Sequence, residues 1–439
     1  QTSAAEGDLV VLTVTPEPGK KLMVNSLKYT ANGTTAVIAG NSFAMPAGNV
    51  EVTAAFITTS NNPEAWDGSI DTGWYNTADT SFQISTPAQL AGLAAVVNGT
   101  ADGIAQDYFA DKTITLQSSI DLGGVQNQDG TWDPAGAQWT AIGGGEPGEV
   151  GAAFNGTFDG GGHIISNLYI ERQAAGQDSN AGKNQGLFGI INAKACVKNL
   201  GVTGYVAAFR SVGGVVGKNW GRVESCFNAA TVVSTANKGV GGIVGANWTQ
   251  NSTPSVVNCY NTGSVLAKYE VGLAGGIAGD NEYLIANCYN AGPVACLNAS
   301  PYIGGITGNI KNGSTDGKTS PIVRNCYFNS AYNDKGIGNI DTGAYTITNM
   351  EGRTAEEMKT AAFVDLLNAD SGNAFMLDTN NSNSGYPILA WQAAATTGDV
   401  NGDGMVNILD VVQAVNFAMG ETTLTTEQFN TADTNADGS

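Results

Sequence analysis

The chain has 439 residues, of which 42% are hydrophobic and 13% are charged, and its formal net charge is −20. This length allows two or three domains, and the hydrophobic fraction is sufficient for ordered cores, which excludes a disordered chain. An acidic surface repels nucleic acid and anionic lipid, and no apolar run approaches the roughly 20 residues that span a bilayer, so we expect no nucleic acid and no membrane insertion.

The N-terminal residues 1–58 carry short apolar runs such as Leu9–Pro16 and Val50–Phe56, separated by Gly, Pro and Asn. This pattern predicts small antiparallel strands. With its Pro-Gly turn, the segment Met45–Val50 and the closing Phe56, the region resembles the internalin B-repeat module of bacterial surface proteins. The resemblance implies one further strand before the turn at Ala5–Asp8, so we expect the module to begin incomplete, with an open sheet edge.

A helix is predicted to start at Thr86, which can act as N-cap, with Pro87 at the first helical position and Gln89 at the third. An apolar face follows from Leu90 to Val97, and Gly99 ends the helix. An amphipathic helix in front of a long series of strands can cover the exposed end of a solenoid.

Two signatures recur through the centre of the chain at intervals of roughly 30 residues, typical of a repeat architecture. The first places a cysteine before an aromatic residue, at Cys226-Phe, Cys259-Tyr, Cys288-Tyr and Cys326-Tyr. The second reads Gly-Gly-x-x-Gly, at Gly213–Gly217, Gly241–Gly245, Gly275–Gly279 and Gly304–Gly308.

We interpret each repeat as three short strands, which together form one coil of a right-handed parallel β-helix, in a chain that is mostly β. Glycine fits corners where stacked backbones leave no room for a side chain, and asparagine tolerates left-handed backbone and can form ladders along the stack. The glycine signature resembles the GLUG-motif repeats of bacterial secreted and surface proteins. The resemblance extends over residues 70–392, including an exit at Phe363–Asn368 and Gly385–Trp391.

Near the C-terminus, twelve residues place oxygen donors at the spacing of a calcium loop, with Gly404 at its sharp turn. The expected ligands are Asp399, Asn401, Asp403, the carbonyl of Met405, Asn407 and Asp410. A second, incomplete loop offers Asp433, Asn435 and Asp437. Hard Ca2+ prefers these oxygens, and calcium is the only cofactor that we expect.

An aspartate at the last loop position, with a helix from Asp410 to Met419 after the loop, resembles the dockerin module of cellulosome-type assemblies. The resemblance implies a small α-helical module over residues 398–439 that binds a cohesin on another protein. It places the partner contacts at Ile408, Leu409 and Val412.

The six cysteines leave two alternatives open. Cys226, Cys259, Cys288 and Cys326 would form an inward column of reduced thiols, since stacked equivalent residues point the same way and not at each other. Cys196 and Cys296 lie outside the column, and a disulfide that involves one of them stays open. A zinc site is not expected, because the chain has no tight Cys-x-x-Cys pair and His163 is its only histidine.

The sequence predicts no enzyme activity. A hydrolase triad would require His163, which lies in a glycine-rich turn. The acidic residues Asp121, Asp159 and Asp280 fall in different coils and do not cluster as a polysaccharide-cleaving β-helix would need.

Aromatic residues give candidates for a carbohydrate site. By strand alternation the tyrosines after the cysteines face outward, and two tryptophans follow the glycine signature. The candidates are Tyr260, Tyr289, Tyr327, Trp220 and Trp248. Alternatively, these rings cover hydrophobic rims or pack beneath loops.

Together these features predict a non-catalytic, secreted, bacterial cell-surface protein for adhesion or ligand presentation, with a rigid rod attached through a calcium-dependent dockerin. One alternative is a filament in which a neighbouring copy of the chain completes the unfinished end. A second is a carbohydrate-binding or glycan-active component of a cellulosome-like complex, with polysaccharide as ligand.

Overall fold

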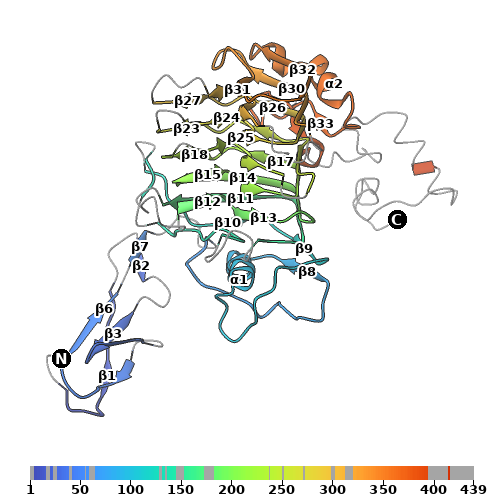
Figure 1. Ribbon diagram of the computed structural model, residues 1–439. Helices are drawn as coiled ribbons and strands as arrows, with labels where there is room; N and C mark the ends of the chain where they lie inside the picture. Colours follow the sequence, from blue (N-terminus) through green and yellow to red (C-terminus); the bar gives the residue numbers. More distant parts are fainter. Residues whose placement is uncertain are drawn as a thin grey trace.

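The computed structural model describes residues 4–15, 20–22, 27–38, 42–54, 56–58, 65–127, 131–133, 136–144, 153–172, 182–236, 238–249, 252–269, 272–297, 302–311, 320–393 and 414–415. Within these residues the chain is mostly β, and its large sheets are parallel (Figure 1). No helix in this described part is long and apolar enough to cross a membrane.

The N-terminal residues form small antiparallel sheets, as predicted. Their strands are β1 (Leu9–Val11) with β5 (Ser42–Ala44), β3 (Lys28–Ala31) between β4 (Thr34–Val37) and β6 (Val50–Thr53), and β2 (Lys20–Leu22) with β7 (Phe56–Thr58). The β3–β4 hairpin turns at Asn32 and Gly33, whose φ angles of 48° and 77° are those that an Asn-Gly hairpin turn requires.

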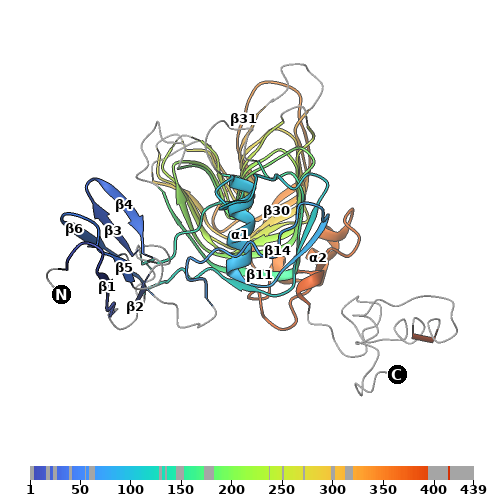
Figure 2. The ribbon, with the colours of Figure 1, turned by 90° about the horizontal axis from the view of Figure 1, so that it is seen from below.

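Helix α1 (Pro87–Asn98) confirms the predicted helix. Thr86 is its N-cap and forms a capping box with Gln89, and Gly99 ends it in the left-handed conformation at φ 70°. Its residues from Leu90 to Val97 are buried in the main hydrophobic core. Seen from below, α1 lies across the first coils of the stack (Figure 2). Since its buried residues belong to the main core, it covers this end of the stack.

The central region consists of three parallel sheets, and most repeats contribute to all three. The first sheet contains β8 (Ser81–Ile84), β9 (Thr113–Leu116), β10 (Ile120–Asp121), β11 (Thr157–Glu171), β14 (Cys196–Ala208), β17 (Arg222–Asn228), β18 (Thr231–Ser234), β21 (Ser255–Val257), β22 (Tyr260–Asn261), β23 (Val265–Ala267), β26 (Leu284–Asn290), β27 (Val294–Cys296), β30 (Ile322–Asn329) and β32 (Thr346–Arg353). The second contains β12 (Lys183–Gln185), β15 (Arg210–Gly213), β19 (Val240–Gly241), β24 (Ala274–Gly275) and β28 (Ile303–Gly304). The third contains β13 (Phe188–Ile191), β16 (Val216–Asn219), β20 (Val244–Asn247), β25 (Ala278–Asn281), β29 (Thr307–Ile310) and β31 (Ile337–Ile340).

Equivalent residues of successive repeats pair in register, for example Cys288 with Cys326 and Val216 with Val244. The predicted stacking of repeats is therefore confirmed, and Figure 1 shows the coils one above another. The glycine signature has the expected steric cause. A Cβ on Gly213 would lie 2.2 Å from the carbonyl oxygen of Val216, and the same clash recurs in the later copies.

Asparagines stabilise the turns of the first sheet, as predicted. The residue before each cysteine or its equivalent adopts a left-handed backbone, with φ close to 50°. These residues are Asn167, Asn199, Ser225, Asn258, Asn287, Asn325 and Asn349. Their side chains hydrogen-bond from coil to coil, with Asn287 donating to Asn258 at 3.1 Å.

After the last coil, residues 354–393 return along the outer side of the first sheet; we call them the clamp segment. Its elements are η2 (Glu357–Lys359), α2 (Ala361–Asn368), β33 (Phe375–Met376), β34 (Ile388–Leu389) and η3 (Ala390–Gln392). Strands β33 and β34 pair in antiparallel fashion. Figure 1 shows α2 and β33 beside β30 and β32.

Candidate functional site

An aromatic column runs along the outer side of the first sheet. Phe227, Tyr260, Tyr289 and Tyr327 pair in register on successive coils. The rings of Phe227 and Tyr260 are nearly parallel at 5.1 Å, and those of Tyr260 and Tyr289 at 5.0 Å. Offset stacking of this kind stabilises each neighbouring pair by about 0.5–1.5 kcal/mol beyond burial.

The cysteine column lies on the opposite side of the same strands. Cys226, Cys259, Cys288 and Cys326 are fully buried free thiols in the main core, as predicted. Cys196 and Cys296 are also free and half-buried, so the structure contains no disulfide at either. Burial raises the pKa of the thiols of Cys226 and Cys288 well above the ordinary value, which keeps them neutral.

The aromatic column is enclosed by the clamp segment. Phe363 of α2 meets the ring of Tyr327 edge-on at 5.3 Å and that of Tyr289 at 6.0 Å. Leu367 and Phe375 complete a second hydrophobic core. The structure thus places Tyr260, Tyr289 and Tyr327 outside the cysteine core, as alternation predicts, but packed beneath another segment. Tyr289 is 0% exposed, so its ring is not available to a ligand.

Polar contacts fasten the clamp segment to the column. The Tyr289 hydroxyl donates to the carbonyl of Pro387 and accepts from Asn383 Nδ2 at 2.9 Å. The Tyr260 hydroxyl donates to Gln392 Oε1 at 2.9 Å. Burial raises the pKa of both phenols, so they remain hydrogen-bond donors at neutral pH.

The last residues of the clamp segment are held by a tryptophan. The indole of Trp391 stacks on Phe227 at 5.9 Å, and its Nε1 donates to the Ser225 carbonyl at 2.9 Å. These contacts of Trp391 fix the end of the clamp segment on the stack.

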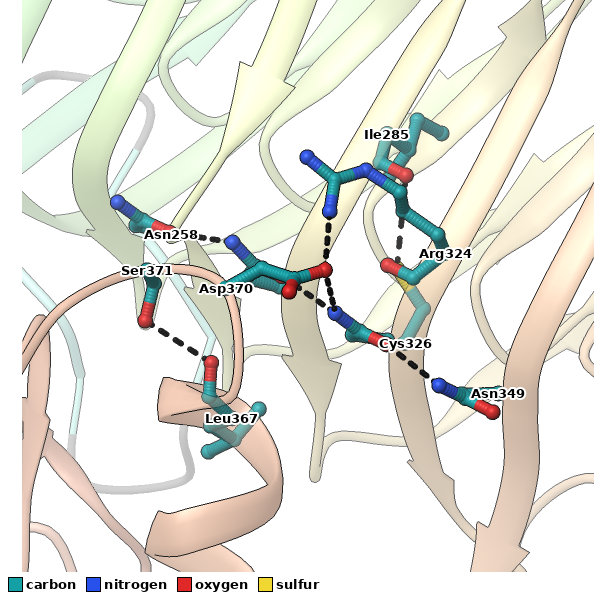
Figure 3. A network of polar contacts seen from close by, with 10 residues as sticks. Asn258, Ile285, Arg324, Cys326, Asn349, Leu367, Asp370 and Ser371 are labelled. Carbon is teal, nitrogen blue, oxygen red and sulfur yellow. Dashed lines mark hydrogen bonds and ion pairs between the residues drawn. The ribbon is translucent and has the colours of Figure 1, made fainter.

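A polar network fixes the middle of the clamp segment (Figure 3). The carboxylate of Asp370, just after α2, accepts from Arg324 Nη1 and from Asn325 Nδ2, the latter at 2.9 Å. Asn325 also belongs to the asparagine ladder, where it accepts from Asn349 at 2.9 Å. The clamp segment is therefore bonded to the repeat stack along its length.

The loop before β34 is organised by one carboxylate. Burial alone would raise the pKa of Asp378, but backbone N–H groups of Asn383, Gly385 and Ser382 bond to its oxygens and bring the pKa below the ordinary value. An ionised Asp378 keeps this loop in place beside Tyr289 and Tyr260.

The two candidate tryptophans lie after β16 and β20 of the third sheet, on neighbouring coils. Trp220 is 4% exposed and Trp248 is half-buried. The ammonium group of Lys218 lies 5.3 Å from the ring centroid of Trp220 and 4.9 Å from that of Trp248, while Lys311 lies 4.8 Å from the latter. Lysines of the chain itself thus cover these rings by cation–π contacts.

Asp280 completes this cluster. It accepts from Trp248 Nε1 at 2.9 Å and from Asn309 Nδ2 at 3.1 Å. Burial raises the pKa of this carboxyl to about 6, although the hydrogen bond from Trp248 opposes the shift. The sequence contains no local signal for this pairing of Lys218, Trp248 and Asp280, because they come from three different coils.

Two acidic residues of the first coils, Asp121 and Asp159, accept hydrogen bonds from nearby turns and coils. Asp121 Oδ1 accepts from the N–H of Gly123 and from Asn167, and Asp159 Oδ1 accepts from the N–H of Gly161 and from Asn199. They lie in separate coils, as expected. Among the described residues no group of three or more His, Cys, Asp or Glu side chains could hold a metal ion.

The predicted calcium ligands and the cohesin contacts Ile408, Leu409 and Val412 lie outside the described residues. Within the predicted helix from Asp410 to Met419, Ala414 and Val415 are described, and both are helical. The donor set of the first loop, with carboxylate, amide and carbonyl oxygens only, fits the chemistry of Ca2+.

Two family models match the ends of the chain. Residues 397–439 match the dockerin type I domain, and residues 1–60 match the divergent InlB B-repeat domain. Both resemblances seen in the sequence are confirmed by these matches. Type I dockerin domains bind calcium, and dockerin domains bind cohesin modules.

Two further proteins are similar to this chain. Halomucin of Haloquadratum walsbyi is 28% identical over 159 residues, which is 36% of this chain and 2% of halomucin. The chain therefore spans a small fraction of that relative. A crystal structure of a candidate immunoglobulin A1 protease from Bacteroides ovatus is similar at a TM-score of 0.41 and 20% identity, over 71% of this chain and 92% of that one.

Proposed function

We propose that the chain is a non-catalytic extracellular surface protein in which a rigid stack of repeats is attached to a partner through a C-terminal dockerin. The stack, over residues 70–392, is a right-handed parallel β-helix of GLUG-type repeats. An internalin B-repeat-like module precedes it over residues 1–58, and the dockerin occupies 398–439. The match of residues 397–439 to the dockerin type I domain carries this proposal.

Calcium would be held by the first loop, with Asp399, Asn401, Asp403, Asn407 and Asp410 as ligands together with one backbone carbonyl. The metal would bring these loop residues together and so position the helix that follows. Ile408 and Leu409, before that helix, and Val412, within it, would contact a cohesin module.

The clamp segment suits this role physically. A load applied through the dockerin passes first to Trp391 and Gln392, which are bonded to Ser225 and Tyr260 of the stack. Adhesion or ligand presentation requires such a firm connection between the body of the protein and its anchor.

Binding to a panel of immobilised type I cohesin modules tests this function. We expect the full chain to be captured by at least one cohesin with Ca2+ and released by EGTA. A double variant, Asp399→Ala with Asp403→Ala, should lose capture, whereas Asp102→Ala, a change at an exposed residue of the stack, should retain it. Capture that is equal with Ca2+ and EGTA, or absent from the whole panel, would contradict the proposal.

The head-to-tail filament stays a prediction that no observation favours. Electron microscopy of the purified protein would reveal filaments directly.

A further inference from the structure

A groove runs between the clamp segment and the turns of the first sheet. Its volume is about 800 Å³, and it is open to solvent. The floor is formed by Thr203 of β14 and by Ala229, Thr262 and Ala291, which directly follow β17, β22 and β26, so that four successive coils contribute one residue each. With coils about 4.8 Å apart, the floor is about 14 Å long, which suits a chain-like ligand better than a compact one.

The lining of the groove is uncharged. Although the chain has a net charge of −20, none of the residues that line this groove is Asp, Glu, Lys, Arg or His. Hydroxyl and amide groups line it instead, including Thr262, Ser384, Asn383 and Gln392. A site of this composition desolvates no ionised side chain when a neutral polar ligand enters.

Aromatic rings provide the apolar part of the lining. Tyr332 is 52% exposed, and Tyr386 and Trp391 are half-buried. Two of these rings are held in place before any ligand arrives. Trp391 Nε1 donates to the Ser225 carbonyl. The hydroxyl of Tyr386 accepts from Asn329 Nδ2, and the centroid of its ring lies 4.6 Å from Lys359 Nζ. Preorganised rings lose little conformational entropy on binding.

We propose that this groove binds a neutral oligosaccharide segment. Sugar rings combine apolar faces, which pack on aromatic side chains, with hydroxyl groups, which need donors and acceptors such as Thr262 and Gln392. A peptide strand fits less well, because the backbone groups of the floor are already bonded between coils. The N–H of Ala229 donates to Val202, and that of Ala291 to Asn261.

The site does not depend on the dockerin. Its lining residues lie within the stack and the clamp segment, whereas the calcium loop begins at Asp399. Oligosaccharide binding should therefore persist in EGTA, and a failure of one proposal is distinguishable from a failure of the other.

An array of neutral and acidic glycans, followed by calorimetry with the best neutral oligosaccharide, tests the inference with the full chain. We expect saturable binding to a neutral glycan. Tyr332→Ala should weaken it about fivefold, since the loss of one ring contact is worth about 1 kcal/mol. Ala229→Arg, which places a long charged side chain on the exposed floor, should abolish it.

Tyr345→Ala is the matched control, because Tyr345 is 47% exposed and lies outside the groove. Its affinity should equal that of the unchanged chain. The inference is overturned if no neutral glycan on the array binds, if only acidic glycans bind, or if Tyr332→Ala and Ala229→Arg bind as well as Tyr345→Ala.

Discussion

At the residue scale, neighbouring side chains on one strand have opposite environments. Cys288 points into the main core, whereas Tyr289 points to the other side and is buried there by the clamp segment. Strand alternation explains why the two side chains point to opposite faces of the sheet. The clamp segment, which returns along the outer face, explains why Tyr289 is buried there. Both faces of such a strand are therefore buried, one by the main core and the other by the clamp segment.

The cysteines should differ in reactivity. With iodoacetamide at pH 8, we expect Cys296 to be alkylated first and Cys196 more slowly, because burial raises the pKa of Cys196. The four column thiols should react only after unfolding, since they are fully buried. Peptide mass spectrometry of the native and urea-treated protein measures the extent of alkylation at each cysteine. Rapid native labelling of Cys259 would argue against the buried column.

Asp280 should make stability depend on pH in an unusual direction. Its pKa in the folded chain is about 6, against an ordinary value of 3.8, so the folded state holds this proton more tightly. The free energy of unfolding should therefore be greatest at acidic pH and decrease as pH rises from about 4 to about 6. From pH 7.5 to pH 5 the expected gain is about 1.4 kcal/mol.

Urea denaturation of the unchanged chain and of Asp280→Asn at both pH values measures this gain. The difference between the two proteins isolates Asp280 from the other titratable groups, which both proteins share. Equal pH dependence in both proteins would show that the carboxyl is not held in its protonated form.

At the element scale, ladders of buried asparagines connect the coils of the third sheet. Asn219 donates to Asn247 at 2.8 Å, and Asn247 donates to Asn281 at 2.8 Å. All three are completely buried. Asn247 accepts from Asn219 and donates to Asn281, so its loss removes one buried hydrogen bond from each neighbour.

Asn247→Ala should lower the free energy of unfolding by about 3 kcal/mol, because it removes three side-chain hydrogen bonds, to Asn219, Asn281 and the Leu284 carbonyl, at about 1 kcal/mol each. Thr348→Ala, on the exposed side of β32, is the control and should change stability by less than about 0.5 kcal/mol. Chemical denaturation of the two variants provides the comparison. A loss below 1 kcal/mol for Asn247→Ala would mean that the ladder is not a stabilising element.

At the scale of the whole molecule, the stack and the proposed anchor have different sources of stability. The stack depends on a buried core that continues from coil to coil. The anchor would depend on carboxylates that repel one another until calcium binds between them.

Calorimetry in the presence of Ca2+ and then EGTA should reflect this difference. We expect EGTA to leave the main unfolding transition unchanged, while limited proteolysis after Trp391 becomes faster as the C-terminal module loosens. Unchanged protease sensitivity of that end in EGTA would count against the proposed metal site.

The sequence by itself determined the repeating features. The glycine signature, the left-handed asparagines, the cysteine column and the capped helix α1 all arise from local sterics and from periodicity, which a single chain displays. The calcium loop is likewise defined by the spacing of its oxygen donors, and the family matches at both ends agree with the sequence patterns.

Only the tertiary structure decided what covers the outward residues. Alternation assigns Tyr289 to a side of the sheet, but its partners Asn383 and Pro387 are more than ninety residues away, at separations of 94 and 98. The lysines over Trp248 and the uncharged groove beside Trp391 are likewise formed by residues that are distant in the sequence. Contacts between segments so distant in the chain depend on how the clamp segment and the coils pack, and no local pattern encodes them.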